Sequence, residues 1–329
     1  MEGTVASVEK KKETKNPPLL YNLAELQNDC SRMFKISPDE TLKQVQELYE
    51  KKLVTYPRTD ARVLSTAVAK EIYKNIGGLR GFGPLAEAAA EVLEKGSYKG
   101  IEKTRYVNDK QITDHYAIIP TGQGMGALRS LPSLTARVYE VISRRFLSVF
   151  YPAATYRKYA LEMVAEGKGG EIMNAGAAAS SQEHFYASFK VMEDQGYLKI
   201  AYKSPRTASS ERMKEEKNSE ESSESPEGNN TDNPAFIAML GSLKKGMKLP
   251  LTNLVIKEGE TSPPKRYTSG SMILAMENAG QLIEDEELRA QIKGSGIGTS
   301  ATRAEILKKL FHIKYLSLNA KTQVVIPTL

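Results

Sequence analysis

The spacing of apolar residues divides the chain into helical and extended parts. Between residues 19 and 149 apolar positions recur every three or four residues, as on the packed face of a helix. Asn22 and Ser37 each stand where such a face begins, and side chains of these types accept hydrogen bonds from the first turn. The second of these helices is predicted to carry Tyr49 on its apolar face. Further helices in this block are predicted over Leu64–Ile76, Pro84–Lys95 and Pro132–Val149.

Two other segments alternate apolar and polar residues, which is typical of strands. Phe185 to Val191 alternates in this way, and Tyr197 to Tyr202 repeats the strand character after a glycine turn. The first residues, Val5 to Val8, have the same character and lead into Lys10 to Lys12, which we interpret as a basic linker. We expect the first strand to join the later ones in one β domain, into which the helical block is inserted.

The last region is predicted to contain three short helices and a hairpin, an arrangement similar to winged-helix DNA-binding domains. The predicted helix starts are Thr268, then Glu284–Glu287, then either Thr299 or Thr302, and the hairpin lies between Tyr315 and Pro327.

Charge is distributed unevenly along the chain. The formal net charge is +6, but residues 204–232 contain four basic and eight acidic residues, or −4, so the remainder carries +10. A basic remainder favours binding to a polyanion, although an ordinary basic surface explains it equally well. Residues 204–233 have almost no apolar side chains to offset the entropy of ordering, so we predict a mobile insert there, with a functional acidic segment as the alternative.

The chain has one cysteine, Cys30, which excludes a disulfide framework within it and a cysteine-based metal site. Cys30 falls on one helix face with Leu23 and Leu26, so a place in the core is expected. No apolar run reaches membrane length, and the first residues lack the apolar core of a signal peptide. We expect a soluble, cytoplasmic protein that does not associate with membranes.

The candidate chemistry lies between Leu53 and Arg62. A β-branched run ends at Tyr56 because Pro57 cannot continue a ladder or a helix, and Arg58 follows immediately. A phenol can attack a phosphodiester, and a guanidinium can hold two phosphate oxygens as charge develops. The alternative is structural: a tyrosine that closes a strand and packs against a helix.

This stretch resembles the active-site segment of type IA DNA topoisomerases, most closely the bacterial topoisomerase III branch. Alanine stands at position 61, where that family usually has serine after the aspartate. Further similar blocks follow in family order and cover most of the chain outside the middle insert. The matching blocks are YEKKLVTYPRTDARVLS (Tyr49–Ser65), PPLLYNLAELQ (Pro17–Gln27), ITDHYAIIPT (Ile112–Thr121), RFLSVFYP (Arg145–Pro152), PPKRYTSGSMILAMENAG (Pro263–Gly280) and GIGTSATRAEIL (Gly296–Leu307).

The resemblance implies a multidomain α+β fold, an incomplete form of the type IA topoisomerase fold. Its β-rich arch domain is formed by residues 1–18 and 150–262 and is interrupted by a helical, winged-helix-like domain over residues 19–149 that carries the tyrosine. Residues 263–329 correspond to part of a helical, winged-helix-like domain that binds single-stranded DNA.

The resemblance also implies roles for individual residues. Tyr56 is the expected nucleophile, and Arg58 and His115 are expected to hold the scissile phosphate. The glycines at 294, 296 and 298 are interpreted as a turn that presents backbone amides to a phosphate, although without the resemblance a plain interhelical turn is favoured. The expected DNA contacts are Thr59, Asp60, Lys265, Arg266, Thr299, Thr302 and Arg303.

The residues named so far do not include a base or a metal site. Deprotonating a tyrosine of pKa about 10 at pH 7 costs about 4 kcal/mol. In the related enzymes a separate Toprim domain supplies a glutamate, a lysine and an Asp-x-Asp pair that binds Mg²⁺, and no Asp-x-Asp occurs in this chain. We therefore expect a monomeric fragment that binds single-stranded DNA, contains no metal ligands and is inactive without the Toprim domain in cis.

Two other functions remain open on the sequence alone. The first is a non-enzymatic winged-helix DNA-binding protein in which Tyr56 is structural. The second, a tyrosine recombinase, is disfavoured because His115 follows the tyrosine and has Ile118, not arginine, three residues after it.

Overall fold

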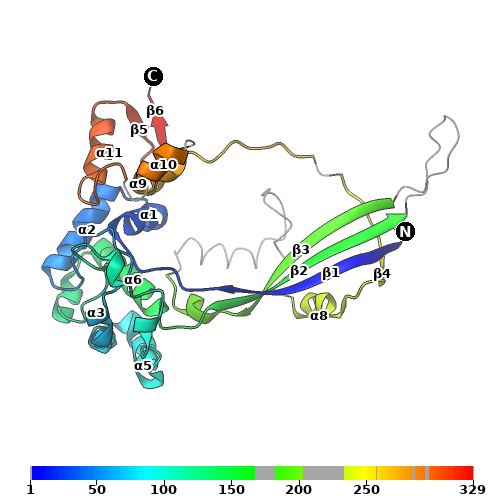
Figure 1. The fold of residues 1–329 in the computed structure, drawn as a ribbon, viewed down its shortest axis with the longest axis horizontal. Coiled ribbons are helices and arrows are strands. Elements are labelled where there is room, and N and C mark those ends of the chain that lie inside the picture. Colours follow the sequence, from blue (N-terminus) through cyan, green and yellow to red (C-terminus); the bar gives the residue numbers. More distant parts are fainter. Residues whose placement is uncertain are drawn as a thin grey trace. The chain divides into compact units, whose positions relative to one another are not determined.

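The computed structural model describes residues 2–166, 182–202, 233–256, 258–283, 286–292 and 296–328. Residue contacts divide the chain into two compact units (Figure 1). The first consists of Met1–Asn16, Ala153–Gly196 and Met213–Ser262, and the second of Pro17–Pro152, Tyr197–Arg212 and Pro263–Leu329. The mixture of helices and an antiparallel sheet confirms the predicted α+β class. The predicted insert at 204–233 lies almost wholly outside the described residues.

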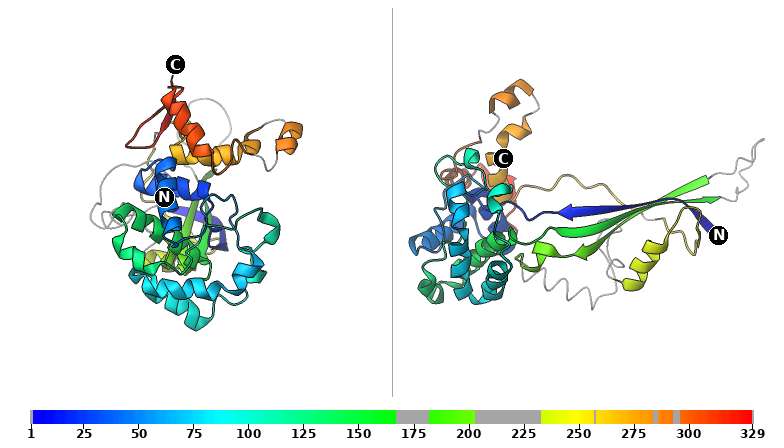
Figure 2. Two further views of the ribbon diagram at one scale, coloured as in Figure 1. Left: turned by 90° about the vertical axis from the view of Figure 1, so that its left-hand side faces the viewer. Right: turned by 60° about the horizontal axis from the view of Figure 1, so that its bottom comes forward.

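The first unit is built on a sheet with the strand order β3-β2-β1-β4, and its paired strands are antiparallel. Figure 2 shows β1, β2 and β3 running side by side over most of their length. The bounds are β1 Glu2–Lys15, β2 Ala154–Glu166, β3 Gln182–Asp194 and β4 Lys248–Pro250, with the helix α8 at Pro234–Ser242. Leu240 and Leu243 pack with Tyr159 and Val191 in a small core. The predicted strand around Phe185–Val191 is confirmed as β3, and it lies in the same sheet as the first strand, with β2 between them.

The predicted basic linker at Lys10–Lys12 is wrong, because these residues lie within β1. Lys10 pairs with Tyr159 of β2, and its ammonium donates to the Gly241 carbonyl at 2.6 Å. Lysine has low strand propensity, but the ladder hydrogen bonds come from the backbone. Its long methylene chain can also lie on apolar surface while the charge stays in water.

The predicted strand at Tyr197–Tyr202 is also wrong. The chain forms the 3₁₀ turn η6, Gly196–Lys199, and the Tyr197 amide donates to the Pro152 carbonyl at 2.9 Å. Tyr197 and Ile200 are buried in the second unit. Their apolar spacing therefore reflects packing against helices.

The second unit begins with helices whose starts were predictable. Asn22 Oδ1 accepts from the Glu25 amide at 2.9 Å, and Ser37 Oγ accepts from the Glu40 amide at 3.1 Å. The predicted helix over Leu64–Ile76 is instead two short helices, because the backbone leaves helical geometry at Glu71. The helices are α1 Leu23–Phe34, α2 Pro38–Glu50, α3 Thr66–Lys70, α4 Ile72–Gly78, α5 Ala86–Lys95 and α6 Ser133–Ser148. The 3₁₀ turns are η1 Leu79–Gly81, η2 Gly83–Leu85, η3 Ile101–Lys103, η4 Asp109–Gln111 and η5 Met125–Ser130.

The core of this block is apolar, with one buried ionic cluster. Cys30 is fully buried among leucines as predicted, and burial raises the pKa of its thiol. Nearby, Arg145 Nη2 donates to Asp29 Oδ2 at 2.9 Å and to the Tyr21 hydroxyl oxygen at 3.0 Å. The Tyr21 hydroxyl in turn donates to Asp29 at 2.6 Å, and burial raises its pKa. We call Tyr21, Asp29 and Arg145 the buried ionic cluster.

The C-terminal segment packs against the first helices of the same unit. Its elements are α9 Ser269–Glu277, η7 Ala279–Leu282, α10 Glu286–Ile292, α11 Arg303–His312, β5 Leu316–Leu318 and β6 Val325–Pro327. The Thr268 cap and the terminal hairpin are confirmed. A Cβ on Gly270 would lie 2.7 Å from the Asn28 Cα, so glycine allows α9 to approach α1 closely. Whether the two predicted DNA-binding parts are winged helices stays a prediction.

Candidate active site

The segment that carries Tyr56 is fixed by backbone contacts on both sides. Thr55 exchanges hydrogen bonds with the 117–119 segment: its amide donates to Ile119 O at 3.0 Å, and its hydroxyl donates to Ala117 O at 3.0 Å. Val54 forms an isolated bridge with Pro120, so the predicted short strand is reduced to one bridge. The predicted end of extended structure at Tyr56 agrees with the fold.

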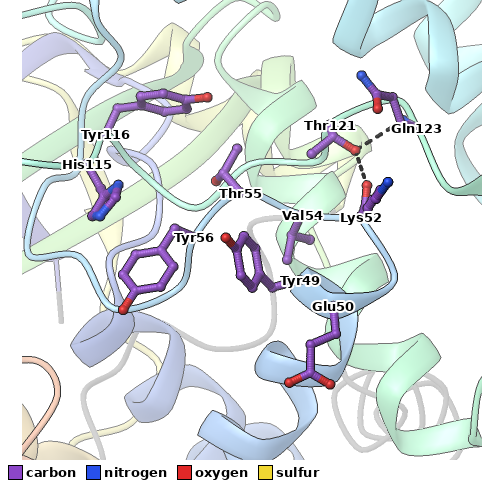
Figure 3. A pocket seen from close by; sticks show the side chains of 10 residues that line it. All are labelled: Tyr49, Glu50, Lys52, Val54, Thr55, Tyr56, His115, Tyr116, Thr121 and Gln123. Carbon is purple, nitrogen blue, oxygen red and sulfur yellow. Dashed lines mark hydrogen bonds between the residues drawn. The ribbon is translucent and has the colours of Figure 1, made fainter.

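Tyr56 is half-buried and opens into a pocket of about 560 Å³ (Figure 3). The pocket is lined by Tyr49, Glu50, Lys52, Val54, Thr55, Tyr56, His115, Tyr116, Thr121 and Gln123. The Tyr56 ring lies between two others: its centroid is 5.4 Å from that of Tyr49, edge to face, and 4.3 Å from that of His115. The fold thus brings together Tyr56 and His115, which are 59 positions apart in the sequence.

Arg58 is not among the residues that line this pocket. Its side chain is exposed, and within the described part of the chain it has no ion-pair partner. An exposed guanidinium without an ion-pair partner can bind a phosphate directly, because no bond to a carboxylate has to break first. Its predicted role at the scissile phosphate stays a prediction.

Thr59 is buried, and its hydroxyl is engaged by the protein. The hydroxyl donates to the His115 carbonyl at 2.9 Å and accepts from the Ala61 amide at 3.1 Å. Thr59 therefore links the Tyr56 segment to the His115 segment. In this arrangement it holds the site together and is not exposed for a DNA contact.

Asp60 and Arg303 are paired across 243 residues of sequence. Arg303 Nη1 donates to Asp60 Oδ1 at 2.9 Å and lies 3.8 Å from Glu277 Oε1. Arg303 is only 4% exposed, and among the described residues its buried Nε has no partner. Burial raises the pKa of Glu277, while the Arg303 charge acts in the opposite direction. A DNA contact by Arg303 would require this ion pair to open.

The glycine turn packs on the end of α9. The Ile297 amide donates to Met276 O at 2.8 Å, and a Cβ on Gly296 would lie 2.7 Å from that same oxygen. Thr299 and Thr302 are exposed and hydrogen-bonded to each other, since the Thr299 amide donates to Thr302 Oγ1 at 2.8 Å. Residue 294 lies outside the described residues.

The remaining predicted contacts are exposed side chains. His115 is exposed in the pocket lining, and Lys265 and Arg266 are exposed just before the Thr268 cap. Within the described ranges, no three His, Cys, Asp or Glu side chains are placed to hold one metal ion. Likewise, no helix in the described ranges is long and apolar enough to cross a membrane.

Two pocket residues of interest were missed or misread from the sequence. Tyr49 was assigned to an apolar helix face but is 39% exposed and lines the pocket at the end of α2. Lys52 gave no local signal at all, yet its backbone is left-handed with φ 60°. The burial of Tyr116, also in the lining, raises the pKa of its phenol.

Gly124 follows the pocket residue Gln123 and packs closely against the backbone of Lys51 and Lys52. Gly124 has φ +68°, and a Cβ on it would lie 2.4 Å from the Lys51 carbonyl oxygen. We expect Gly124→Ala to lower the free energy of unfolding by about 2 kcal/mol or more, because alanine is strained in left-handed backbone and has no room. Urea denaturation measures this loss.

Gly126→Ala is the matched control, because a Cβ on Gly126 would meet nothing within 4 Å. We expect it to change stability by less than about 0.5 kcal/mol. Equal stability of the two variants would contradict the close packing at Gly124.

Comparisons with known proteins agree along the whole chain. A family model described as DNA topoisomerase matches residues 1–329. The chain is 33% identical over 317 residues to DNA topoisomerase 3 of Bacillus subtilis (strain 168), covering 94% of this chain and 38% of that protein. It is 30% identical over 321 residues to DNA topoisomerase 3 of Shouchella clausii (strain KSM-K16), covering 96% and 38%.

A solved structure shows the same fold. The full-length topoisomerase I from Thermotoga maritima superposes with a TM-score of 0.57 at 20% identity, over 99% of this chain and 43% of that one. The chain thus spans less than half the length of the relatives it resembles.

Proposed function

Because this chain belongs to the DNA topoisomerase family, we propose that it is the tyrosine-bearing part of a type IA enzyme similar to topoisomerase III. The observation that supports this role is the opening of Tyr56 into a pocket beside His115. A tyrosine sealed in the core could not reach a DNA backbone. The chain covers 38% of its Bacillus subtilis relative, and we propose that the complete activity needs further domains.

The proposed reaction is a transesterification on one DNA strand. The Tyr56 phenol oxygen attacks a backbone phosphorus, the bond to the 3′-oxygen breaks, and that oxygen leaves with a proton as a 3′-hydroxyl. Tyr56 is then joined to the 5′-phosphate, and another strand passes through the break. Attack by the 3′-hydroxyl reverses the step, so negative supercoils are relaxed or DNA is decatenated without ATP.

Side chains beside the tyrosine hold the phosphate in this proposal. Arg58 can donate two parallel hydrogen bonds to its oxygens, and His115 can donate one from its ring. Thr59 positions His115 through its carbonyl. Asp60, Lys265, Arg266, Thr299, Thr302 and Arg303 remain proposed DNA contacts. Asp60 and Arg303 would serve only after separating from each other.

Magnesium is proposed to be held by a Toprim domain in cis, outside this chain. The metal would supply charge stabilisation at the phosphate. We also propose that the protein is a cytoplasmic monomer.

The isolated chain should bind single-stranded DNA without relaxing supercoiled plasmid in the presence of Mg²⁺. The reason is that the proposed magnesium ligands lie in the Toprim domain, outside this chain. Agarose gels of plasmid topoisomers measure the activity. Relaxation by the chain alone would refute the assignment of magnesium to another domain.

The polarity of the covalent adduct tests the proposed function. The longer protein that contains this chain is mixed with an oligonucleotide labelled at either end, and the mixture is denatured. A 5′-phosphotyrosine retains only the 3′ label on protein and releases the 5′-labelled piece. DNA binding with no adduct from either label would favour the non-enzymatic alternative.

A further inference from the structure

The pocket beside Tyr56 contains more aromatic surface than attack on a phosphate requires. Tyr49, His115 and Tyr116 line it with Tyr56, and they come from two separate segments of the chain. Tyr49 is 39% exposed although it stands on a helix whose other apolar residues are packed. Exposed rings gathered around one hollow form a surface on which a planar group can stack.

We propose that this pocket holds one nucleotide beside the phosphodiester that Tyr56 attacks, with the base stacked on the ring of Tyr49. This rests on the proposed function, because it takes Tyr56 as the nucleophile. It makes Tyr49 a positioning residue that sets where the DNA backbone lies.

The ring geometry fits this arrangement. The rings of Tyr49 and Tyr56 are inclined by 80° at a centroid distance of 5.4 Å. A base lying flat on Tyr49 therefore meets Tyr56 edge-on and does not cover its ring face. The pocket volume of about 560 Å³ lies within the range of small-ligand sites.

Lys52 supplies a charge for the phosphate of the same nucleotide. It is exposed in the pocket lining, and within the described residues it has no ion-pair partner. Its carbonyl accepts from Thr121 Oγ1 at 2.5 Å, and Thr121 Oγ1 accepts from the Gln123 amide at 3.1 Å (Figure 3). These contacts fix the backbone from which the ammonium extends.

The lining favours a nucleotide over a purely apolar ligand. Thr55, Thr121 and Gln123 add hydroxyl and amide groups to the rings and the cation. Rings for the bases and cations for the backbone are the combination that binds single-stranded nucleic acid. The one carboxylate, Glu50, is exposed at the helix end and accepts from Gln46 at 3.2 Å.

The test compares two probes that differ only in their bases. One is a fluorescent oligonucleotide of about 12 deoxyadenosines, a length within the usual site size, and the other is an abasic strand of equal length. Because every position is alike in each probe, the result does not depend on where the chain binds. Fluorescence anisotropy at low salt gives the affinities of the full chain and its variants.

We expect Tyr49→Leu to weaken binding of the deoxyadenosine strand by about 5- to 150-fold, the usual loss for one stacked base. The abasic strand should bind this variant and the unmodified chain equally. Tyr49→Phe keeps the ring and should remain within about twofold on both probes. Circular dichroism verifies that each variant is folded.

Lys52→Gln provides the contrasting pattern. We expect it to weaken binding of both probes by similar factors and to lower the salt slope of log affinity by about 1, because it removes one phosphate contact. Tyr49→Leu should leave that slope unchanged.

Equal loss on both probes with Tyr49→Leu, no loss on either, or no detectable binding by the unmodified chain would overturn the stacking proposal. The labelled-adduct experiment is separate. An adduct without base-dependent loss refutes stacking but leaves the function standing. Base-dependent loss without an adduct supports the nucleotide site and refutes Tyr56 as the nucleophile.

Discussion

Tyr56→Phe is expected to abolish the proposed denaturation-resistant DNA adduct when this chain is joined to the proposed Toprim domain. The substitution removes only the oxygen that would form the bond to phosphorus. The phenylalanine ring can keep the contacts that Tyr56 makes with Tyr49 and His115. No hydrogen bond of the Tyr56 hydroxyl is found within the described residues, so the variant should fold with nearly unchanged stability.

The measurement is the fraction of labelled DNA that stays with protein after denaturation. Tyr73→Phe is the matched control, since Tyr73 is 45% exposed on α4 and lies outside the pocket lining. It should form the adduct normally. Full adduct formation by Tyr56→Phe would mean that another residue is the nucleophile, and peptide mapping of the adduct would identify it.

Only part of this site was predictable from the sequence. The fold brings Tyr56 next to His115, which lies far from it in the sequence. A shared site for these two residues was expected only from the resemblance to a family. No local pattern pairs Asp60 with Arg303 or buries Thr59 under His115. All three are predicted DNA contacts, and in this structure they contact other parts of the protein, so their contacts with DNA stay a prediction. The sequence shows which residues are polar or charged, but not which other residues contact them in the folded protein.

The same distinction applies to the fold. The helix starts at Asn22 and Ser37 were predictable because a cap acts within three residues of itself. The strand at Lys10 and the 3₁₀ turn at Tyr197 were not, because distant segments determine them: β2 pairs with the lysine, and Pro152 accepts from the tyrosine amide. Tyr49 was misread for a related reason. Helical spacing shows on which face of α2 Tyr49 stands, but not whether another part of the chain covers that face.

The largest loss of stability is expected from a substitution that breaks the buried ionic cluster. Arg145→Met should lower the free energy of unfolding by about 3–5 kcal/mol, because Asp29 would keep a buried charge without this partner. The side chains of Arg145 and Asp29 are only 15% and 9% exposed. The exposed Arg32, which also contacts Asp29, compensates little since solvent screens it.

Urea denaturation of the chain measures this loss, with Lys43→Met as the control at a surface pair. Lys43 lies 3.4 Å from Asp39 with its side chain 64% exposed, so its removal should cost less than about 1 kcal/mol. Adding Asp29→Asn to Arg145→Met should recover part of the stability. Asparagine removes the charge and keeps an oxygen that can accept from Tyr21.

This prediction also separates two roles for a residue in a family-like block. Arg145 begins RFLSVFYP, and an arginine in a DNA enzyme is readily assigned to a phosphate. Its guanidinium instead lies 4.0 Å from the Tyr21 ring centroid and donates to the Leu19 carbonyl at 3.1 Å. If the role of Arg145 is structural, Arg145→Met should destabilise the chain. The molecules of the variant that remain folded should then bind DNA with unchanged affinity. Unchanged stability with weakened DNA binding would refute that role and place Arg145 on the DNA.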